Sequence, residues 1–250
     1  MSKNNFLQIS NISKKYLSKN QLETYAVRNL SLSMDENEMV AVMGSSGSGK
    51  TTLIHILTGL LSPDKGQVFL KEQDIMQMSK DEAALFRRKN IGIVFQNYNL
   101  LNSLTVDENI RVPLILDGQW EHQDEKVEKV AKLLGISDEL KKYPYEISGG
   151  QQQRVGIARA IINQPKMIFA DEPTGNLDSK STKQVMEYFV HACQNTLSGL
   201  LMVTHDAIAA SYCHRVVFLQ DGHIVFEVYK KGAQQSFYNT ILEVQKEWVK

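Results

Sequence analysis

The stretch that decides the fold runs from Glu38 to Leu61 and reads "EMVAVMGSSGSGKTTLIHILTGLL". Its beginning is a continuous apolar run that ends in Gly44, as in a parallel strand buried on both faces. Its end, from Lys50 onward, has the apolar spacing of a helix. Between the two lies a loop rich in glycine and serine. The order of strand, glycine-rich loop and helix predicts an α/β core with an anion site at the start of the helix.

The loop from Gly44 to Thr51 matches the spacing of a phosphate-binding loop. Glycines allow the backbone to wrap around a phosphate and to direct successive N–H groups at it. We expect Lys50 to reach the β- and γ-phosphates of a nucleotide and Thr51 to ligate Mg²⁺. The alternative is a glycine-rich turn without a ligand, which the complete pattern disfavours. The other residues expected around the phosphates are Gly44, Ser45, Ser46, Gly47, Ser48 and Gly49.

Further strands and helices lie on both sides of this stretch. Residues 6–12 and 26–34 alternate between apolar and polar side chains, as half-buried antiparallel strands do. Residues 167–171 and 199–205 are apolar runs typical of buried strands, and residues 180–193 have helical spacing. Alternating strands and helices predict an open parallel sheet with helices on both faces, which binds ligands at the carboxyl ends of its strands.

Four polar side chains stand at or just beyond the ends of apolar runs. Asp171 closes "MIFAD", and its carboxylate can hold Mg²⁺ through water. Glu172 follows, where a carboxylate can orient and deprotonate the water that attacks the γ-phosphate. Gln96 ends "IGIVFQ" and can reach both Mg²⁺ and that water, while His205 ends "LLMVTH" and can hydrogen-bond the γ-phosphate. Each alone would be an ordinary strand-end residue; the phosphate loop favours the catalytic interpretation.

Residues 97–163 differ from the rest because their pattern is helical and contains no good strand. We expect a helical insertion in the α/β core here. It contains "EISGGQQQR", residues 146–154, in which a serine and two glycines precede a helix. The bare N–H groups of such a helix start suit an anion. The chain therefore has a second candidate phosphate site.

The tail "SFYNTILEVQKEWVK" carries one apolar stripe of an amphipathic helix, formed by Phe237, Ile241, Val244 and Trp248. We expect this helix to dock on the chain's own core. A contact between copies of the chain is the alternative.

Composition excludes several functions. The 28 basic and 28 acidic side chains among 250 residues cancel, so the chain has no strong field toward nucleic acid or an anionic membrane. Cys193 and Cys213 lack metal-ligand spacing and are expected to be reduced thiols of a cytosolic protein. The start shows no signal peptide, and no apolar run approaches the ~18 to 20 residues that span a bilayer. A role at a membrane would require a partner chain.

Six motifs stand in the order found in the ATP-binding subunits of ABC transporters, which the chain resembles over essentially residues 5–228. They are Gly44–Thr51, Gln96, Ser148–Gln151, Asp171–Glu172, Asn176–Asp178 and His205. The resemblance implies an ATPase that uses ATP and Mg²⁺, with a P-loop NTPase (RecA-like) core, an antiparallel β subdomain and an inserted α-helical subdomain. It implies residues 1–96 and 164–228 for the core with the β subdomain, 97–163 for the helical signature subdomain, and 229–250 for the C-terminal amphipathic helix.

In the family that the chain resembles, the second anion site serves a neighbour's nucleotide. The resemblance implies a homodimer in which the signature residues of one copy cover the ATP held by the phosphate loop of the other. Asp178 matches the loop that crosses between the copies. The signature residues are Ser148, Gly149, Gly150 and Gln151. Ile147 stands where leucine is commonest before the serine, an apolar exchange of similar volume.

The resemblance assigns two more nucleotide contacts. Tyr16 stands where the family stacks an aromatic ring on adenine, and Tyr25 is the rival for that role. Thr52 should bond the α-phosphate. With Lys50 and the four strand-end side chains all present, two competent sites per homodimer are expected, against the alternative of a regulatory relative that does not hydrolyse ATP.

The segments "ADEPTGNLD" and "VFQNYNLLNSLTVDENIRVPL" resemble the branch that contains the macrolide-exporter, lipoprotein-release and bacitracin-resistance ATPases. This implies a separate membrane permease, docked near Asn97–Pro113, and a place at the cytoplasmic face of the cell membrane. Likeness over residues 97–118 favours antimicrobial-peptide or antibiotic resistance or export. The alternatives are a lipoprotein-release or cell-division ATPase, or a soluble ABC ATPase without a permease. No nucleic-acid partner is expected.

Overall fold

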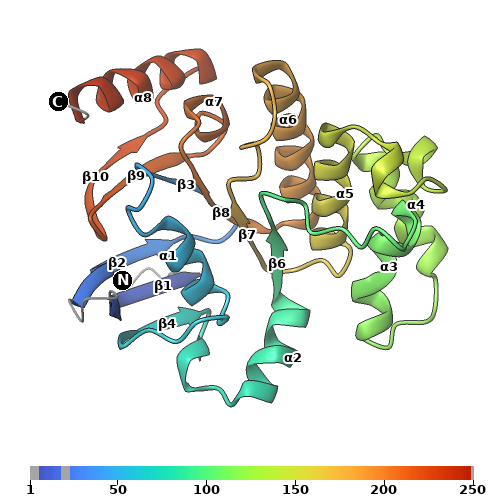
Figure 1. Ribbon diagram of the computed structural model, residues 1–250, viewed down its shortest axis with the longest axis horizontal. Helices are drawn as coiled ribbons and strands as arrows, with labels where there is room; N and C mark the ends of the chain where they lie inside the picture. The colour runs from blue at the N-terminus through green and yellow to red at the C-terminus, as the bar shows by residue number, and fades with distance from the viewer. Residues whose placement is uncertain (1–5, 18–22, 249–250) are drawn as a thin grey trace.

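A six-stranded sheet forms the centre of this computed structural model, which describes residues 6–17 and 23–248 (Figure 1). The strand order is β10-β9-β3-β8-β7-β6. Neighbouring strands are parallel except for β10, which is antiparallel to β9. The strands are β3 (Met39–Met43), β6 (Ile91–Val94), β7 (Met167–Asp171), β8 (Gly199–Thr204), β9 (Arg215–Gln220) and β10 (His223–Tyr229).

The two middle strands of the six-stranded sheet, β3 and β8, are continuous apolar runs in sequence. Every residue of β3 and of β8 is buried, because helices or the second sheet cover both faces. Since β3, β7 and β8 run in the same direction, the residues that follow them meet at one edge of the sheet. The predicted open, mostly parallel sheet is confirmed, and its carboxyl edge is the expected place for a ligand.

A second, antiparallel sheet packs against the first with the order β2-β1-β4-β5. Its strands are β1 (Leu7–Leu17), β2 (Glu23–Met34), β4 (Lys65–Leu70) and β5 (Gln73–Asp74). Leu7 pairs with Met34 and Ile9 with Leu32, so the alternating apolar residues of β1 and β2 share one buried face. That face joins β3 and α1 in one apolar core. The strands predicted at 6–12 and 26–34 are both present, and both are longer than expected.

The helices are distributed unevenly around the sheets. They are α1 (Lys50–Leu57), α2 (Lys80–Asn90), α3 (Val106–Leu116), α4 (Gln123–Leu133), α5 (Gly149–Ile161), α6 (Ser179–Thr196), α7 (Ala207–Ala210) and α8 (Gln234–Trp248), with 3₁₀ turns at Ile75–Gln77, Ser137–Glu139 and Pro144–Glu146. Residues 97–163, all of them described, contain α3, α4 and α5 and no strand. In Figure 1 these three helices gather at one end of the molecule, far from the antiparallel sheet.

The last helix, α8, lies beside α7 (Figure 1). Phe237 and Ile241 are buried in the same core that lines the central sheet, and Val244 is partly buried against it. Gln234 adds a hydrogen bond to the hydroxyl of Ser211, just after α7. Three members of the predicted stripe therefore pack on the chain itself; the side chain of Trp248 lies outside the described residues.

Several elements differ from the sequence-based prediction. Residues 65–70, 73–74, 215–220 and 223–229 form strands, and residues 80–90 form a helix, none of which was predicted. The helix expected over residues 50–61 ends at Leu57. The reason is local: Gly59 adopts a φ of 65°, and the N–H groups of Leu60 and Leu61 both donate to the carbonyl of His55. This closes the helix about one turn early.

Candidate active site

The phosphate loop connects β3 to α1, as predicted. Gly47 and Gly49 have φ values of 81° and 104°, in the left-handed region that glycine tolerates best. A Cβ at Gly49 would lie 2.0 Å from the carbonyl oxygen of Ala26, so the loop touches β2 where only glycine fits. Lys50 is 9% exposed, and its Nζ donates to the carbonyls of Gly44 at 2.8 Å and Ser45 at 3.0 Å. The ammonium group is therefore held at the mouth of the loop.

A cleft of about 760 Å³ opens over this loop and gathers most of the predicted nucleotide residues. Its volume lies within the usual range for small-molecule sites. The lining residues are Tyr16, Ala26, Ser46, Gly47, Gly49, Lys50, Thr51, Thr52, Gln96, Glu172 and His205. Segments that are distant in sequence thus meet at the carboxyl edge of the sheet. Ala26 is the one lining residue that the sequence analysis did not single out.

The two tyrosines considered for adenine stacking occupy different places. Tyr16 lies near the end of β1, is 47% exposed and lines the cleft. Tyr25 lies within β2 rather than before it. The cationic groups of Lys15 and Arg28 lie 4.9 Å and 5.2 Å from its ring centre. An aromatic ring already engaged by two cations suits packing, so the geometry favours Tyr16 as the residue available to a planar base.

Asp171 does not line the cleft itself, but it contacts Thr51, which does, and the two side chains form a pair that suits Mg²⁺. Asp171 ends β7, and its Oδ1 accepts a hydrogen bond of 3.4 Å from the hydroxyl of Thr51. Burial raises the pKa of the Asp171 carboxyl, and the neighbouring charge of Glu172 adds to the effect. No group of three or more His, Cys, Asp or Glu among the described residues could hold a metal. A carboxylate and a hydroxyl fit Mg²⁺, which takes few protein ligands and fills its remaining positions with water and phosphate oxygens.

Glu172 is held beside the cleft in an unusual backbone conformation. Its φ is 45°, a left-handed value that costs a non-glycine residue roughly 1 to 3 kcal/mol. Its N–H donates to the carbonyl of Val203, and its carbonyl accepts from the N–H of Gly175. The carboxylate lies 2.9 Å from Nδ1 of His205 and 3.9 Å from Nζ of Lys50. The strained turn directs the carboxylate toward the imidazole and the ammonium group.

Gln96 lies two residues beyond the end of β6, and its backbone is tied to the segment after Glu172. The amide of Asn176 donates to the carbonyl of Gln96 at 3.1 Å and to the side-chain oxygen of Asn97 at 3.3 Å. A Cβ at Gly175 would lie 3.0 Å from the side-chain nitrogen of Gln96. The two segments are therefore in direct contact.

The signature residues lie outside this cleft, at the start of α5. Ser148 is exposed and caps the helix: its hydroxyl accepts from the N–H of Gln151 at 3.3 Å. The Gln151 side chain accepts in return from the N–H of Ser148 at 2.8 Å and donates to Glu139 at 2.7 Å. Gly149 and Gly150, both partly exposed, form the first turn of the helix. None of the four residues lines the cleft that holds Lys50.

Asp178 also lies outside the cleft and caps the next helix, α6. Its carboxylate accepts hydrogen bonds from the N–H groups of Lys180 and Ser181 and from the hydroxyl of Ser181. The Ser181 bonds, first among these, hold the pKa of the Asp178 carboxyl below its usual range. Within one copy of the chain, Asp178 therefore stabilises the start of α6.

One link between the cleft and α5 was not predicted. The guanidinium group of Arg159, near the end of α5, donates to the carbonyls of Tyr98 at 2.8 Å and Asn99 at 2.6 Å. Tyr98 and Asn99 have φ values of 59° and 49°, and a Cβ at Gly149 would lie 3.0 Å from the Tyr98 hydroxyl. The loop after Gln96 is thus held along α5. No local pattern in the sequence signals this contact, because its partners are about 60 residues apart.

Comparison with known proteins identifies the family of this chain. The family model described as ABC transporter matches residues 27–175, more than half of the chain. The chain belongs to the ABC transporter family. This match includes the phosphate loop, Gln96, the signature and the Asp171–Glu172 pair. The family and the ATPase activity expected from the six motifs are therefore confirmed.

Curated relatives match most of the chain. The ABC transporter ATP-binding protein YxdL of Bacillus subtilis is 45% identical over 241 residues, 96% of this chain and 93% of that protein. The bacitracin export ATP-binding protein BceA of Halalkalibacterium halodurans is 42% identical over 242 residues, 96% of this chain and 95% of that protein. The lipoprotein-releasing system ATP-binding protein LolD of Aquifex aeolicus is 42% identical over 203 residues, 81% of this chain and 90% of that protein. The expected branch of the family is confirmed.

A solved structure gives the same fold. The dimeric post-hydrolysis state of the ATP-binding cassette MJ0796, bound to ADP and Pi, superposes with a TM-score of 0.81 at 33% identity. The match covers 91% of this chain and 100% of that one. Together with the family match, this confirms the P-loop NTPase fold and a nucleotide as ligand. Among the residues that the structure describes, no helix is long and apolar enough to cross a bilayer.

Proposed function

We propose that this ABC ATPase drives a separate membrane permease that confers resistance to, or exports, an antimicrobial peptide of the bacitracin class. The observation that carries the proposal is the extent of the match to BceA. A match over 96% of 250 residues leaves about 10 outside it, so it must extend into α8, which begins at Gln234. The match to LolD leaves 19% of the chain outside. Likeness that extends into the tail favours the BceA-like members over the lipoprotein-release members.

In this proposal the cleft over the phosphate loop binds ATP. Tyr16 stacks on the adenine, Thr52 bonds the α-phosphate, and Lys50 pairs with the β- and γ-phosphates. Thr51, Asp171 and Gln96 would hold Mg²⁺, which neutralises charge on the phosphates when bound. The other phosphate-loop residues contribute backbone N–H groups to the same anions.

Hydrolysis requires a base and a group that senses the γ-phosphate. Glu172 is the proposed base, because its carboxylate lies at the cleft wall within 3.9 Å of the Lys50 ammonium group. His205 keeps this carboxylate oriented through the 2.9 Å contact at Nδ1, and its other ring nitrogen is then available to the γ-phosphate. Gln96 would place the attacking water between them. With all three groups present, both sites of a dimer would be able to hydrolyse ATP.

The position of the signature supports a shared site. Ser148 to Gln151 and Asp178 are partly or fully exposed and do not line their own copy's cleft. In a two-fold dimer each copy would contribute its phosphate loop to one ATP and its signature to the other, an isologous contact. The MJ0796 cassette, whose solved structures are described as dimeric, supports this arrangement.

The proposed permease contact is the segment Asn97–Pro113, which would place the chain at the cytoplasmic face of the membrane. This segment starts directly after Gln96, and Arg159 fixes it to α5. A change at the nucleotide could therefore reach the segment from two directions, through Gln96 and through α5. Such coupling requires two arrangements with different affinities for ATP.

The test is expression of this chain in a bacitracin-sensitive bacterium together with a candidate permease from its own genome. We expect the pair to raise the inhibitory concentration of bacitracin several-fold, and we expect Glu172→Gln to abolish that rise. The control is Glu187→Gln, on the exposed side of α6. Purification of the tagged chain from membranes should recover the permease. Rescue of a lipoprotein-release or cell-division mutant would favour those relatives instead. Absence of any permease in the purified complex would favour the soluble alternative.

A further inference from the structure

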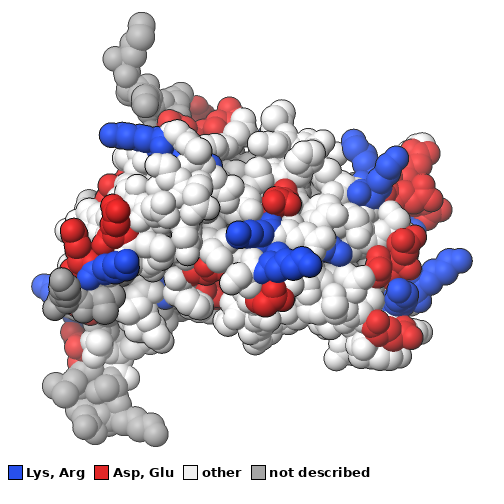
Figure 2. All heavy atoms as spheres, turned by 90° about the horizontal axis from the view of Figure 1, so that it is seen from above, with Lys and Arg blue, Asp and Glu red and all other residues white. Residues whose placement is uncertain are grey.

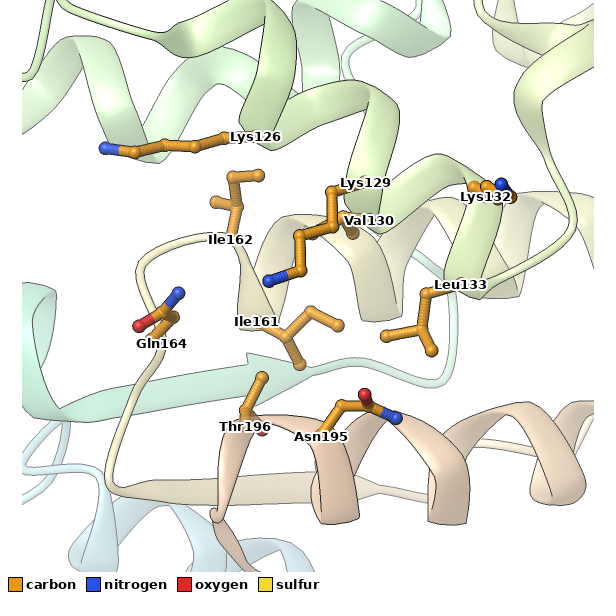
Figure 3. Close-up of a pocket in the computed structure, with 10 residues that line it drawn as sticks. All are labelled: Lys126, Lys129, Val130, Lys132, Leu133, Ile161, Ile162, Gln164, Asn195 and Thr196. Carbon is orange, nitrogen blue, oxygen red and sulfur yellow. The ribbon is translucent and has the colours of Figure 1, made fainter.

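A second cavity of about 300 Å³ lies at the end of α5 remote from the signature, between α4 and the end of α6 (Figure 3). It shares no residue with the nucleotide cleft. Figure 3 shows α4 along one side of the cavity and α6 along the other, with the end of α5 between them. The helical segment 97–163 and the central core therefore both contribute walls.

The inner surface of this cavity is apolar. Ile161 and Ile162, at the end of α5, are 0% and 4% exposed and form its floor. Val130 and Leu133, both partly buried on α4, form the adjacent wall. Binding of an apolar group to a concave apolar surface of this kind is favourable, because the group displaces water from the surface.

The rim of the cavity is cationic. It includes Lys126, Lys129 and Lys132 of α4, and no aspartate or glutamate lines it. Figure 3 shows the Lys129 side chain directed into the opening and the Lys126 side chain along its edge, whereas Lys132 points away. Lys126 donates to the side-chain oxygen of Gln119 at 2.7 Å. For Lys129, the described part of the chain provides no hydrogen-bond or ion-pair partner. On the face drawn in Figure 2, lysines and arginines are interspersed with acidic side chains, so a cavity lined by lysines without a carboxylate is a local feature.

The acidic side chains of α4 do not neutralise this rim. Asp124 pairs with Arg111 at 2.7 Å, and Glu125 lies 3.4 Å from His122. Glu128 is exposed and is not part of the cavity lining. The helix therefore presents cations to the cavity and turns its carboxylates elsewhere.

We propose that this cavity binds a small amphiphilic anion. A single carboxylate or phosphate group would sit between Lys126 and Lys129, and a short alkyl chain would lie on the apolar floor and wall. Charge complementarity selects the anion. Size selects a free small molecule, because about 300 Å³ equals roughly ten water volumes. A peptide helix, about 10 to 12 Å across, would not fit.

The test uses calorimetry on the full chain without nucleotide, with n-octyl phosphate as the probe below its micelle concentration. We expect octyl phosphate to bind, and we expect Lys126→Glu/Lys129→Glu to weaken binding at least about tenfold through loss of two charge-assisted contacts. The matched control is Lys141→Glu/Lys183→Glu, which makes the same charge change at two positions outside the cavity. This control should bind as the parent does. The apolar half of the site is tested by Val130→Asp, which should also weaken binding.

Four further arms identify the ligand chemistry. Octanoate should bind if a carboxylate suffices, and failure of octanoate with success of octyl phosphate would assign the site to phosphates. Octyltrimethylammonium should not bind, because it lacks the negative charge. Inorganic phosphate should not bind, because it lacks the alkyl chain. Equal binding of the cationic amphiphile, or equal affinity of the two double variants, would overturn the proposal. Binding to phosphatidylglycerol vesicles without binding of the monomeric probe would also overturn it. No arm requires ATP, a dimer or a permease, so failure here is distinguishable from failure of the proposed function.

Discussion

At the scale of single residues, Glu172 is the most constrained group of the cleft. Backbone hydrogen bonds on both sides hold it at a left-handed φ, and its carboxylate touches His205 and approaches Lys50. Strain of this kind persists only when the surroundings fix it. The geometry therefore supports a role for the carboxylate itself, and this role can be tested without altering the backbone.

Glu172→Gln should reduce ATP hydrolysis by roughly 10²-fold or more, because an amide cannot accept the proton of the attacking water. ATP binding should be preserved, since the substitution keeps the shape of the side chain. Phosphate release and binding of a fluorescent ATP analogue measure the two quantities separately. Turnover at the parent rate would rule out Glu172 as the base.

Asp171 provides a pH-dependent prediction. Its pKa is raised above 3.8 in the folded chain, chiefly by burial, so its contribution to stability is complete below pH 3.8 and is lost as pH rises through the folded pKa. Asp171→Asn has no charge to bury and should escape this loss. In the absence of metal and nucleotide, the variant should therefore melt at a higher temperature than the parent at pH 7, with a smaller difference near pH 4.

The measurement is a series of melting curves between pH 4 and pH 7 in the presence of a chelator. The control is Asp138→Asn, at an exposed position remote from the cleft. The same Asp171→Asn protein should bind Mg²⁺ and ATP together less tightly, as expected where a site is maintained at the expense of stability. A difference in melting temperature that does not change with pH would contradict burial as the cause.

At the scale of elements, α8 illustrates how a short amphipathic helix is attached. Ile241 is fully buried against the core and Asn239, two residues earlier, lies on a more exposed side. Ile241→Ala should destabilise the chain by about 2 to 5 kcal/mol, as expected for a truncated buried side chain. Asn239→Ala should change the free energy of unfolding by less than about 0.5 kcal/mol. Urea unfolding of both variants measures the difference, and equal effects would show that α8 is not packed on the core in solution.

The elements also show what could be predicted from the sequence. The buried strands around the phosphate loop were predictable, because a short continuous apolar run that ends in a polar residue is typical of a strand covered on both faces. The helix α2 was missed although its start carries a signal: Ser79 and Glu82 form a capping box, the same arrangement that Thr105 and Glu108 form at α3. The strands β9 and β10 were missed although Asp221 and Gly222, both at positive φ, form the turn of a hairpin between them. Only the pairing of β9 with β3 is distant in sequence.

The site was predictable to a similar extent. Residues that belong to compact motifs, such as Lys50 and Glu172, were placed by spacing alone, and the structure brings both to one cleft. The contact between Arg159 and the loop at Tyr98 depends on how α5 lies across the fold. Spacing cannot reveal that contact, since its partners are 61 residues apart and no local pattern links them. Contacts that depend on tertiary packing remain outside the reach of a single sequence.

At the scale of the whole molecule, the separation of the two anion sites has a direct test. A chain with Ser148→Arg keeps its own cleft but cannot cover another copy's nucleotide. A chain with Glu172→Gln can cover a nucleotide but cannot hydrolyse its own. Each variant alone should be inactive in the proposed dimer. An equal mixture should regain about a quarter of the parent activity, because half of randomly assorted dimers are mixed and each mixed dimer has one complete site.

Phosphate release from the two variants, separate and mixed, measures this recovery. The control mixture replaces Ser148→Arg by Glu187→Gln, which should leave the signature intact. Activity of Ser148→Arg alone at the parent level would show that a nucleotide is hydrolysed without the second copy. Failure of the mixture to regain activity, with both chains folded and able to bind ATP, would argue against sites composed of two chains.

The cap at the start of α5 determines what closing of such a dimer would require. Ser148 and Gln151 satisfy each other's backbone N–H groups within one copy, so the first turn of the helix is complete before any nucleotide arrives. The serine hydroxyl acts as an acceptor in that cap, which leaves its proton free for a phosphate oxygen. Capture of the second copy's ATP would then proceed as docking of preformed surfaces, with little ordering entropy to offset. Its rate would depend on encounter and orientation rather than on refolding of the signature.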